Sequence, residues 1–173
     1  MTSLFLEPFS GISGDMLNGL LVDLGGDVAL LRSELEKLGV DGFHLHVDHI
    51  AKSAIWGTDF DVHLHHGEKD TGIEGDFDHK HHHDHEHGHS HVDARSYADI
   101  HDLIAASQLS PFVKEKSLAV FLDIAKAEAA VHNMPVEQIH FHEIGAIDSI
   151  VDIVSFFILV ESLGIDTVYS TPL

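Results

Sequence analysis

Residues 3–26 read SLFLEPFSGISGDMLNGLLVDLGG, and this stretch decides the fold class. The continuous apolar run at 4–6 predicts an inner β-strand within 3–9, because a strand covered on both faces needs no polar alternation. From Met16 to Leu24 the apolar residues recur at helical spacing, and two glycines then mark the end of that helix. A strand, a glycine loop and a helix in this order predict an α/β or α+β domain.

The rest of the chain predicts a single domain in which a mixed sheet of about five strands is covered by helices. Apolar and polar residues alternate over 43–51 and 56–65, which predicts an antiparallel pair of strands. Ser96 begins a capping box, and Ser110 precedes a proline that suits the first helical position. The other expected elements are strands at 139–142 and 167–170, and helices at 28–38, from 96, over 110–132 and over 147–164.

Charge and composition limit the classes of partner. The chain has 173 residues, with 29 acidic and 9 basic side chains and a formal net charge of −20. This charge argues against nucleic acid and anionic membranes and favours cations. Because there is no cysteine, any metal must be held by nitrogen and oxygen ligands. The chain start lacks signal-peptide features and the apolar run 153–160 is too short to span a bilayer, which predicts a cytoplasmic protein.

The stretch 140–152, HFHEIGAIDSIVD, places five metal-binding or proton-transferring groups among apolar residues. If 139–142 is a strand, the side chains of His140 and His142 point to the same side. Asp148 and Asp152 are four residues apart and share one face of the helix that we expect from 147. A buried unpaired carboxylate at 152 would be costly, which favours a functional site. The candidate catalytic residues are His140, His142, Glu143, Asp148 and Asp152, and the two histidines are also candidate metal ligands.

An ordinary structural interpretation of this stretch stays open. Asp148 can be a helix N-cap and Asp152 a first-turn acid favoured by the helix dipole, while the histidines can be hydrogen-bonded strand residues. The stretch does not fit a zincin metalloprotease, because Ala146 stands where that motif has its second histidine.

A second group of candidate ligands lies in a histidine tract over 79–91, inside an acidic insertion over 67–92 that we expect to be disordered. Imidazole suits nickel, zinc, copper and cobalt, so the tract indicates divalent-metal handling without naming the metal. A solvated linker with incidental metal affinity is the alternative. The candidate metal ligands of the tract are His79, His81, His82, His83, His85, His87, His89 and His91.

Two weaker candidates complete the set. The glycine loop before the first helix offers hydroxyl and backbone N–H groups for a phosphate or carboxylate, through Ser10, Gly11, Ser13, Gly14 and Asp15. Because Asp15 would repel a phosphate, either a bridging cation or simple helix capping accounts for it. Glu128 and His132, four residues apart at a helix end, are a candidate metal pair, and dipole stabilisation of His132 is the alternative.

Together these motifs resemble the amino-terminal part of the LarC family of nickel-insertion proteins. The resemblance rests on FSGISGDM at 9–16, the histidine tract, AEAAVH at 127–132 and IHFHEIGAIDSIVDI at 139–153. It implies a CTP-dependent insertase of the lyase class that places Ni²⁺ into pyridinium-3,5-bisthiocarboxylic acid mononucleotide. It further implies that CTP, with Mg²⁺ or Mn²⁺, binds a carboxy-terminal domain that is absent from residues 1–173, and that lactate racemase apoprotein accepts the product. A homo-oligomer is left open.

The resemblance suggests a hand-over in which imidazoles at 140 and 142 present Ni²⁺ to the substrate sulfurs. A carboxylate at 143, 148 or 152 would then accept the proton released as the pyridinium ring bonds to nickel, and the substrate phosphate would rest at the glycine loop. Two other classes remain open at this stage. They are a nickel-storage protein without catalysis and a metal-dependent hydrolase that activates water with the same ligands.

Overall fold

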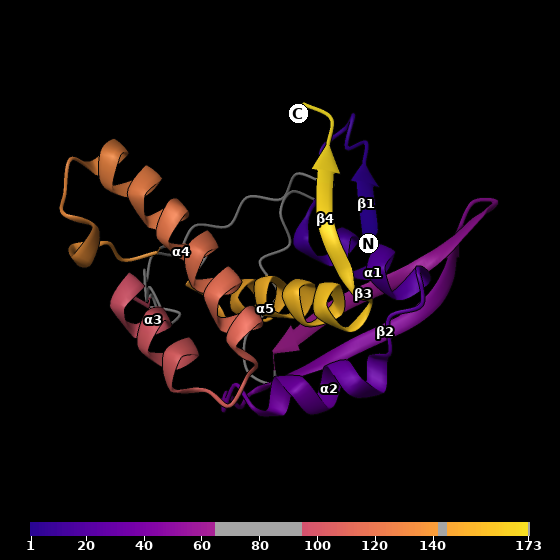
Figure 1. Ribbon diagram of the computed structural model, residues 1–173, viewed down its shortest axis with the longest axis horizontal. Helices are drawn as coiled ribbons and strands as arrows, with labels where there is room; N and C mark the ends of the chain where they lie inside the picture. Colours follow the sequence, from indigo (N-terminus) through magenta and orange to yellow (C-terminus); the bar gives the residue numbers. More distant parts are fainter. Residues whose placement is uncertain (65–94, 142–144, 173) are drawn as a thin grey trace, which may run out of the picture.

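The computed structural model describes residues 1–64, 95–141 and 145–172 (Figure 1). In this part of the chain four strands form two separate two-stranded sheets. Strand β1 (Thr2–Leu6) pairs in parallel with β4 (Ile165–Ser170), and β2 (Phe43–Lys52) pairs antiparallel with β3 (Ile55–Leu64). The antiparallel pair is confirmed. The whole insertion 67–92, with its histidine tract, lies outside the described residues.

The expected single sheet of about five strands is wrong for the described residues. The predicted strand at 139–142 is reduced to one isolated bridge, between His140 and Ser96, and residue 142 itself is not described. β1 is not an inner strand, because its one described partner is β4 and Phe5 is 59 % exposed. The apolar run 4–6 does not mark a strand covered on both faces, because Leu4 is buried while its neighbour Phe5 is exposed to solvent.

The helices agree with the sequence predictions more closely than the strands do. Ser96 and Asp99 form the predicted capping box, and the side chain of Ser110 caps the helix that begins at Pro111. Helix α5 begins after Ala146, so Asp148 lies inside its first turn and is not the N-cap. The described helices are α1 (Gly14–Asp23), α2 (Val28–Glu36), α3 (Tyr97–Ala106), α4 (Pro111–His132), α5 (Ile147–Ser162) and the short 3-10 helix η1 (Val136–Gln138).

Helix α5 is the centre of the core. It crosses the middle of the molecule in Figure 1 and contacts α1, α2, α4 and β3. Val151, Val154 and Leu159 on this helix are fully buried, as expected for a helix surrounded by other elements. Because packing of these apolar residues sets the orientation of α5, it also sets where the few polar side chains of α5 lie. None of the helices in the described residues is long and apolar enough to cross a bilayer.

Candidate functional site

The side chain of Asp152 lies on the face of α5 that meets α1. The amide of Asn18 donates from Nδ2 to the Asp152 backbone carbonyl at 3.1 Å and to its carboxylate oxygen Oδ1 at 3.3 Å. Asn18 is fully buried, and its own Oδ1 atom has no partner among the described residues. A polar pair, Asn18 and Asp152, is thus held inside the contact between α1 and α5.

The surroundings of Asp152 favour its protonated form. Burial, which removes water from the carboxylate, is the main cause that raises the pKa of Asp152 from 3.8 to about 7. The negative charges of Asp15, Asp148 and Asp61 add to the rise, and the hydrogen bond from Asn18 opposes it. These carboxylates come from the start of α1, the start of α5 and strand β3, so the fold gathers negative charge from three elements.

A carboxyl with a pKa near 7 can accept or release a proton at neutral pH, which makes Asp152 chemically suited to general acid or base work. A cation bound among these carboxylates would lower the pKa of Asp152, because a nearby positive charge favours the ionised form of a carboxyl. Within the described ranges, however, no group of three or more histidine, aspartate or glutamate side chains already converges on one metal position.

The glycine loop lies directly beside this carboxyl. A Cβ atom built on Gly14 would lie 2.8 Å from Oδ2 of Asp152, so the start of α1 approaches the carboxylate at van der Waals distance. Ser13 is the N-cap residue of α1 but makes no side-chain capping bond, and Asp15 accepts a hydrogen bond from the backbone N–H of Met16. The structure therefore brings together the loop at 10–15 and the aspartates of α5.

His140 lies elsewhere. Its side chain is exposed, its backbone bridges to Ser96, and its charge acts on Asp99 at the start of α3. That interaction follows the hydrogen bonds from Ser96 as a cause of the lowered pKa of Asp99. No described contact joins His140 to Asp152. His142 and Glu143 lie outside the described residues.

The pair at the end of α4 is formed as expected from its spacing. His132 Nε2 lies 3.2 Å from Glu128 Oε2, and both side chains are partly exposed. No third metal ligand converges with them in the part of the chain that the structure describes. The geometry thus agrees equally with dipole stabilisation of a histidine at a helix end.

Sequence reasoning missed three residues of this region: Asn18, Asp61 and Arg95. The Arg95 guanidinium donates to the carbonyl of Gly145 at 3.2 Å, and its backbone carbonyl accepts from Phe141 N–H at 3.1 Å. Arg95 therefore places a positive charge at the start of α5. Asn18 had a signal, a polar residue among the leucines of an apolar helix face, whereas Asp61 and Arg95 had none, because only folding brings them near α5.

A cavity of about 570 Å³ lies apart from these carboxylates, between the end of α2 and the start of β2. Its wall includes Arg32, Glu36, Asp41 and His44 and none of Asp15, Asp148 or Asp152. We therefore locate the candidate chemistry by the carboxylates and not by this cavity.

Comparison with known proteins identifies the family. A family model described as nickel insertion protein matches residues 4–173. The chain belongs to the nickel insertion protein family. It is 52 % identical over its whole length to the "Pyridinium-3,5-bisthiocarboxylic acid mononucleotide nickel insertion protein" of Lactiplantibacillus plantarum, of which it covers 40 %. No solved structure matches it.

Two other relatives carry the same or a similar name. The chain is 43 % identical to a protein of the same name from Geobacillus kaustophilus and 38 % identical to a "Putative nickel insertion protein" of Dictyoglomus thermophilum. In both cases the whole chain aligns and covers 39 % of the relative. The chain thus spans about two fifths of the length of these relatives.

Proposed function

We propose that this chain is the metal-presenting part of an insertase that places Ni²⁺ into pyridinium-3,5-bisthiocarboxylic acid mononucleotide. The observation that carries the proposal is similarity over the whole of this chain to part of two relatives named for this insertion. The carboxylates gathered beside the glycine loop support it, because their negative charge attracts a cation and a carboxyl with a pKa near 7 can take up a proton at neutral pH.

Asp152 is the proposed proton acceptor. Insertion at the pyridinium ring replaces a carbon–hydrogen bond with a carbon–nickel bond, and the proton that leaves needs a base. A carboxyl whose pKa is about 7 is half ionised at neutral pH, so it can take that proton and return it to water. Asn18 holds Asp152 in place through its amide.

Asp148 and Asp15 flank this position at the starts of α5 and α1. In the proposal they attract the incoming ion, because both add negative charge at Asp152. The glycine loop and the Arg95 guanidinium are the proposed contacts for the substrate phosphate, since backbone N–H groups at a helix start and a guanidinium both favour anions. His140 and His142 remain the proposed residues that present the ion before transfer, and Glu143 remains an alternative proton acceptor.

The finer parts of the proposal follow from the family resemblance. Residues 1–173 would form one nickel-insertion domain of a lyase, and CTP with Mg²⁺ or Mn²⁺ would bind in the carboxy-terminal part of the longer protein. Lactate racemase apoprotein would accept the finished cofactor. The glutamate and histidine at 128 and 132 and the tract at 79–91 would recruit nickel.

The proposal is tested by nickel transfer in the full-length protein that carries this chain. The nickel-free mononucleotide, CTP and Ni²⁺ are supplied, and the nickel-bound product is followed by mass spectrometry. Asp152→Asn should slow transfer by about 100-fold, the usual contribution of a general base, whereas Asp102→Asn, on an exposed surface of α3, should not. Transfer at the normal rate by Asp152→Asn would refute the assigned role.

A second comparison separates insertion from storage and hydrolysis. The double variant His140→Ala/His142→Ala should stop transfer while most bulk nickel binding persists. A storage protein would bind nickel without any transfer by the unmodified chain, and a hydrolase would cleave a panel of esters with metal alone. Either of those results, without product from the unmodified protein, would contradict the proposal.

A further inference from the structure

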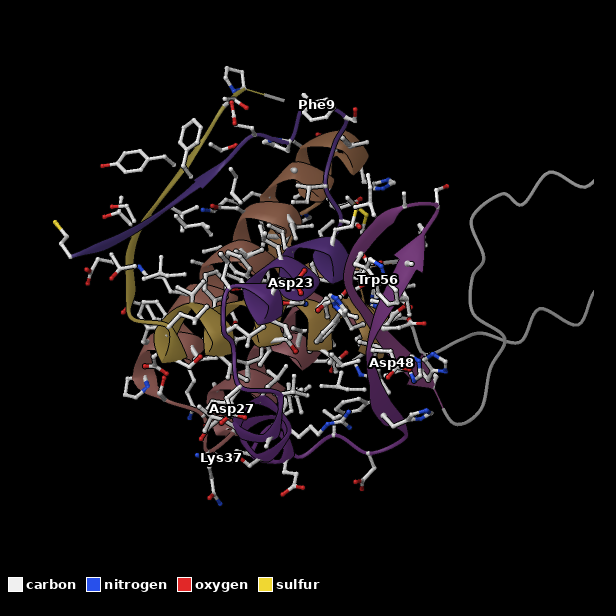
Figure 2. All side chains as sticks on the ribbon, turned by 90° about the vertical axis from the view of Figure 1, so that its right-hand side faces the viewer. Phe9, Asp23, Asp27, Lys37, Asp48 and Trp56 are labelled. Carbon is white, nitrogen blue, oxygen red and sulfur yellow. The ribbon has the colours of Figure 1, made fainter. Side chains whose placement is uncertain are left out.

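A second group of potential ligands lies on the outer face of the β2–β3 hairpin. Side chains alternate along a strand, so His44, His46 and Asp48 share one face, opposite the face that buries Leu45. The strand register sets His63 across from His44 and Asp61 across from His46. We call these five residues, His44, His46, Asp48, Asp61 and His63, the histidine face. Figure 2 labels Asp48 on strand β2 and Trp56 on strand β3 of this hairpin.

The three imidazoles of the histidine face are close enough to share an ion. The ring centres of His44 and His63 are 5.0 Å apart, and those of His46 and His63 are 5.5 Å apart. Two imidazoles bound to one ion have ring centres about 5 Å apart, because each metal–nitrogen bond is about 2 Å long. The spacing of the ring centres therefore already matches that of imidazoles on a shared metal ion.

Each of two histidines is paired with a carboxylate. His63 Nε2 lies 2.9 Å from Asp61 Oδ2, and His46 Nε2 lies 3.0 Å from Asp48 Oδ2. Histidines that bind a metal through one ring nitrogen usually donate the other N–H to a carboxylate, a backbone carbonyl or a water, which orients the ring. In this arrangement Nε2 is held by the carboxylate, and Nδ1 is the atom that would bind a metal.

We propose that His44, His46 and His63 bind a divalent transition-metal ion, with Asp61 and Asp48 as positioning residues that orient two of the rings. Among the described residues no three ligands have yet converged on one point, so the ion must draw the rings inward by side-chain rotation. The side chains of His44 and His46 are exposed, and the ten-residue strands hold the Cα atoms in register.

The histidine face also connects to the carboxylates described above. Asp61 pairs with His63 on one side, and its charge contributes to the raised pKa of Asp152 on the other. A positive ion bound at the histidine face would therefore offset part of the negative charge that Asp152 feels from Asp61. The metal site itself does not rest on the proposed function, because it is defined by the hairpin alone.

Site-specific protection in the full chain tests this proposal. Histidines are modified with diethyl pyrocarbonate with and without added Ni²⁺, and the rate at each residue is read by peptide mass spectrometry. Ni²⁺ should protect His44, His46 and His63 together. His49, on the opposite hairpin face, and His101, which has its own carboxylate partner but lies on α3, are the matched controls. Equal modification of the histidine face with and without Ni²⁺ would overturn the proposal.

Variants decide whether the three histidines act as one site. His44→Ala should release the protection of His46 and His63, whereas His49→Ala should leave it intact. Asp61→Asn should raise the Ni²⁺ concentration needed for protection about tenfold, as for other carboxylates that orient a ligating histidine. Protection of His46 that survives in His44→Ala, or in His63→Ala, would show single-histidine binding and refute a shared site. If one variant fails to fold by circular dichroism, the other still gives this result.

Discussion

Gly14 and Asp152 meet where helices α1 and α5 pack, and a Cβ atom at position 14 would lie 2.8 Å from the carboxylate oxygen Oδ2 and 3.0 Å from Cβ of Asp152. Real Cβ atoms essentially never approach other atoms at the shorter distance. Glycine at this position therefore lets the start of α1 come up to the carboxyl, and this approach is part of what removes water from it.

Gly14→Ala should destabilise the fold by about 1–3 kcal/mol, the usual cost of forcing extra volume into a packed contact. Urea unfolding measures the effect. The matched control is the same change in an Asp152→Ala background, where the carboxylate oxygens are gone and the cost should shrink. An equal cost in both backgrounds would show that the contact with the carboxylate is not the cause.

The raised pKa of Asp152 should make stability depend on pH. In the unfolded chain this carboxyl titrates near 3.8 and in the folded chain near 7, so the folded state binds more protons between these values. The stabilising contribution is fully present below pH 3.8 and is lost as pH rises through about 7. A pKa difference of this size corresponds to at most about 4 kcal/mol.

Asp152→Asn should remove most of this dependence. At pH 8 the variant should be more stable than the unmodified chain in urea unfolding, because it carries no charge that must be buried beside Asp15, Asp148 and Asp61. Asp123→Asn, at an exposed position on α4, serves as the control and should leave the pH profile unchanged. A profile for Asp152→Asn that parallels the unmodified chain would refute the shifted pKa.

Deleting residues 79–91 should sharply lower the number of Ni²⁺ ions bound while thermal stability changes little. The expectation rests on composition, since eight histidines in thirteen residues offer many ligands but little apolar surface for a core. Equilibrium dialysis and thermal unfolding measure the two quantities. Loss of folding on deletion would contradict the separation of recruitment from the fold.

Residues 1–173 alone should show no measurable binding of CTP. The formal net charge of −20 and the small number of basic residues oppose a triphosphate, and no Walker-type lysine follows the glycine loop. Calorimetric titration of CTP with Mg²⁺ or Mn²⁺ into the chain tests this. A dissociation constant in the micromolar range would instead place the nucleotide on this part of the protein.

The sequence by itself determined the local elements and the family. The capping box at Ser96, the cap at Ser110 and the alternating residues of the hairpin are short-range signals, because each depends on residues that are neighbours in the chain. The motifs at 9–16 and 139–153 were long enough to indicate the nickel insertion proteins before any fold was known.

Only the tertiary structure decided the strand pairing and the surroundings of Asp152. β1 pairs with β4, which lies at the opposite end of the chain. The short apolar run at 4–6 contains no information about which strand will pair with it. Asn18 and Asp152 are 134 residues apart in the sequence, and Asp61 lies on a third element, strand β3. A pKa depends on burial and on the distances to other charges, and both quantities exist only once these segments have packed together.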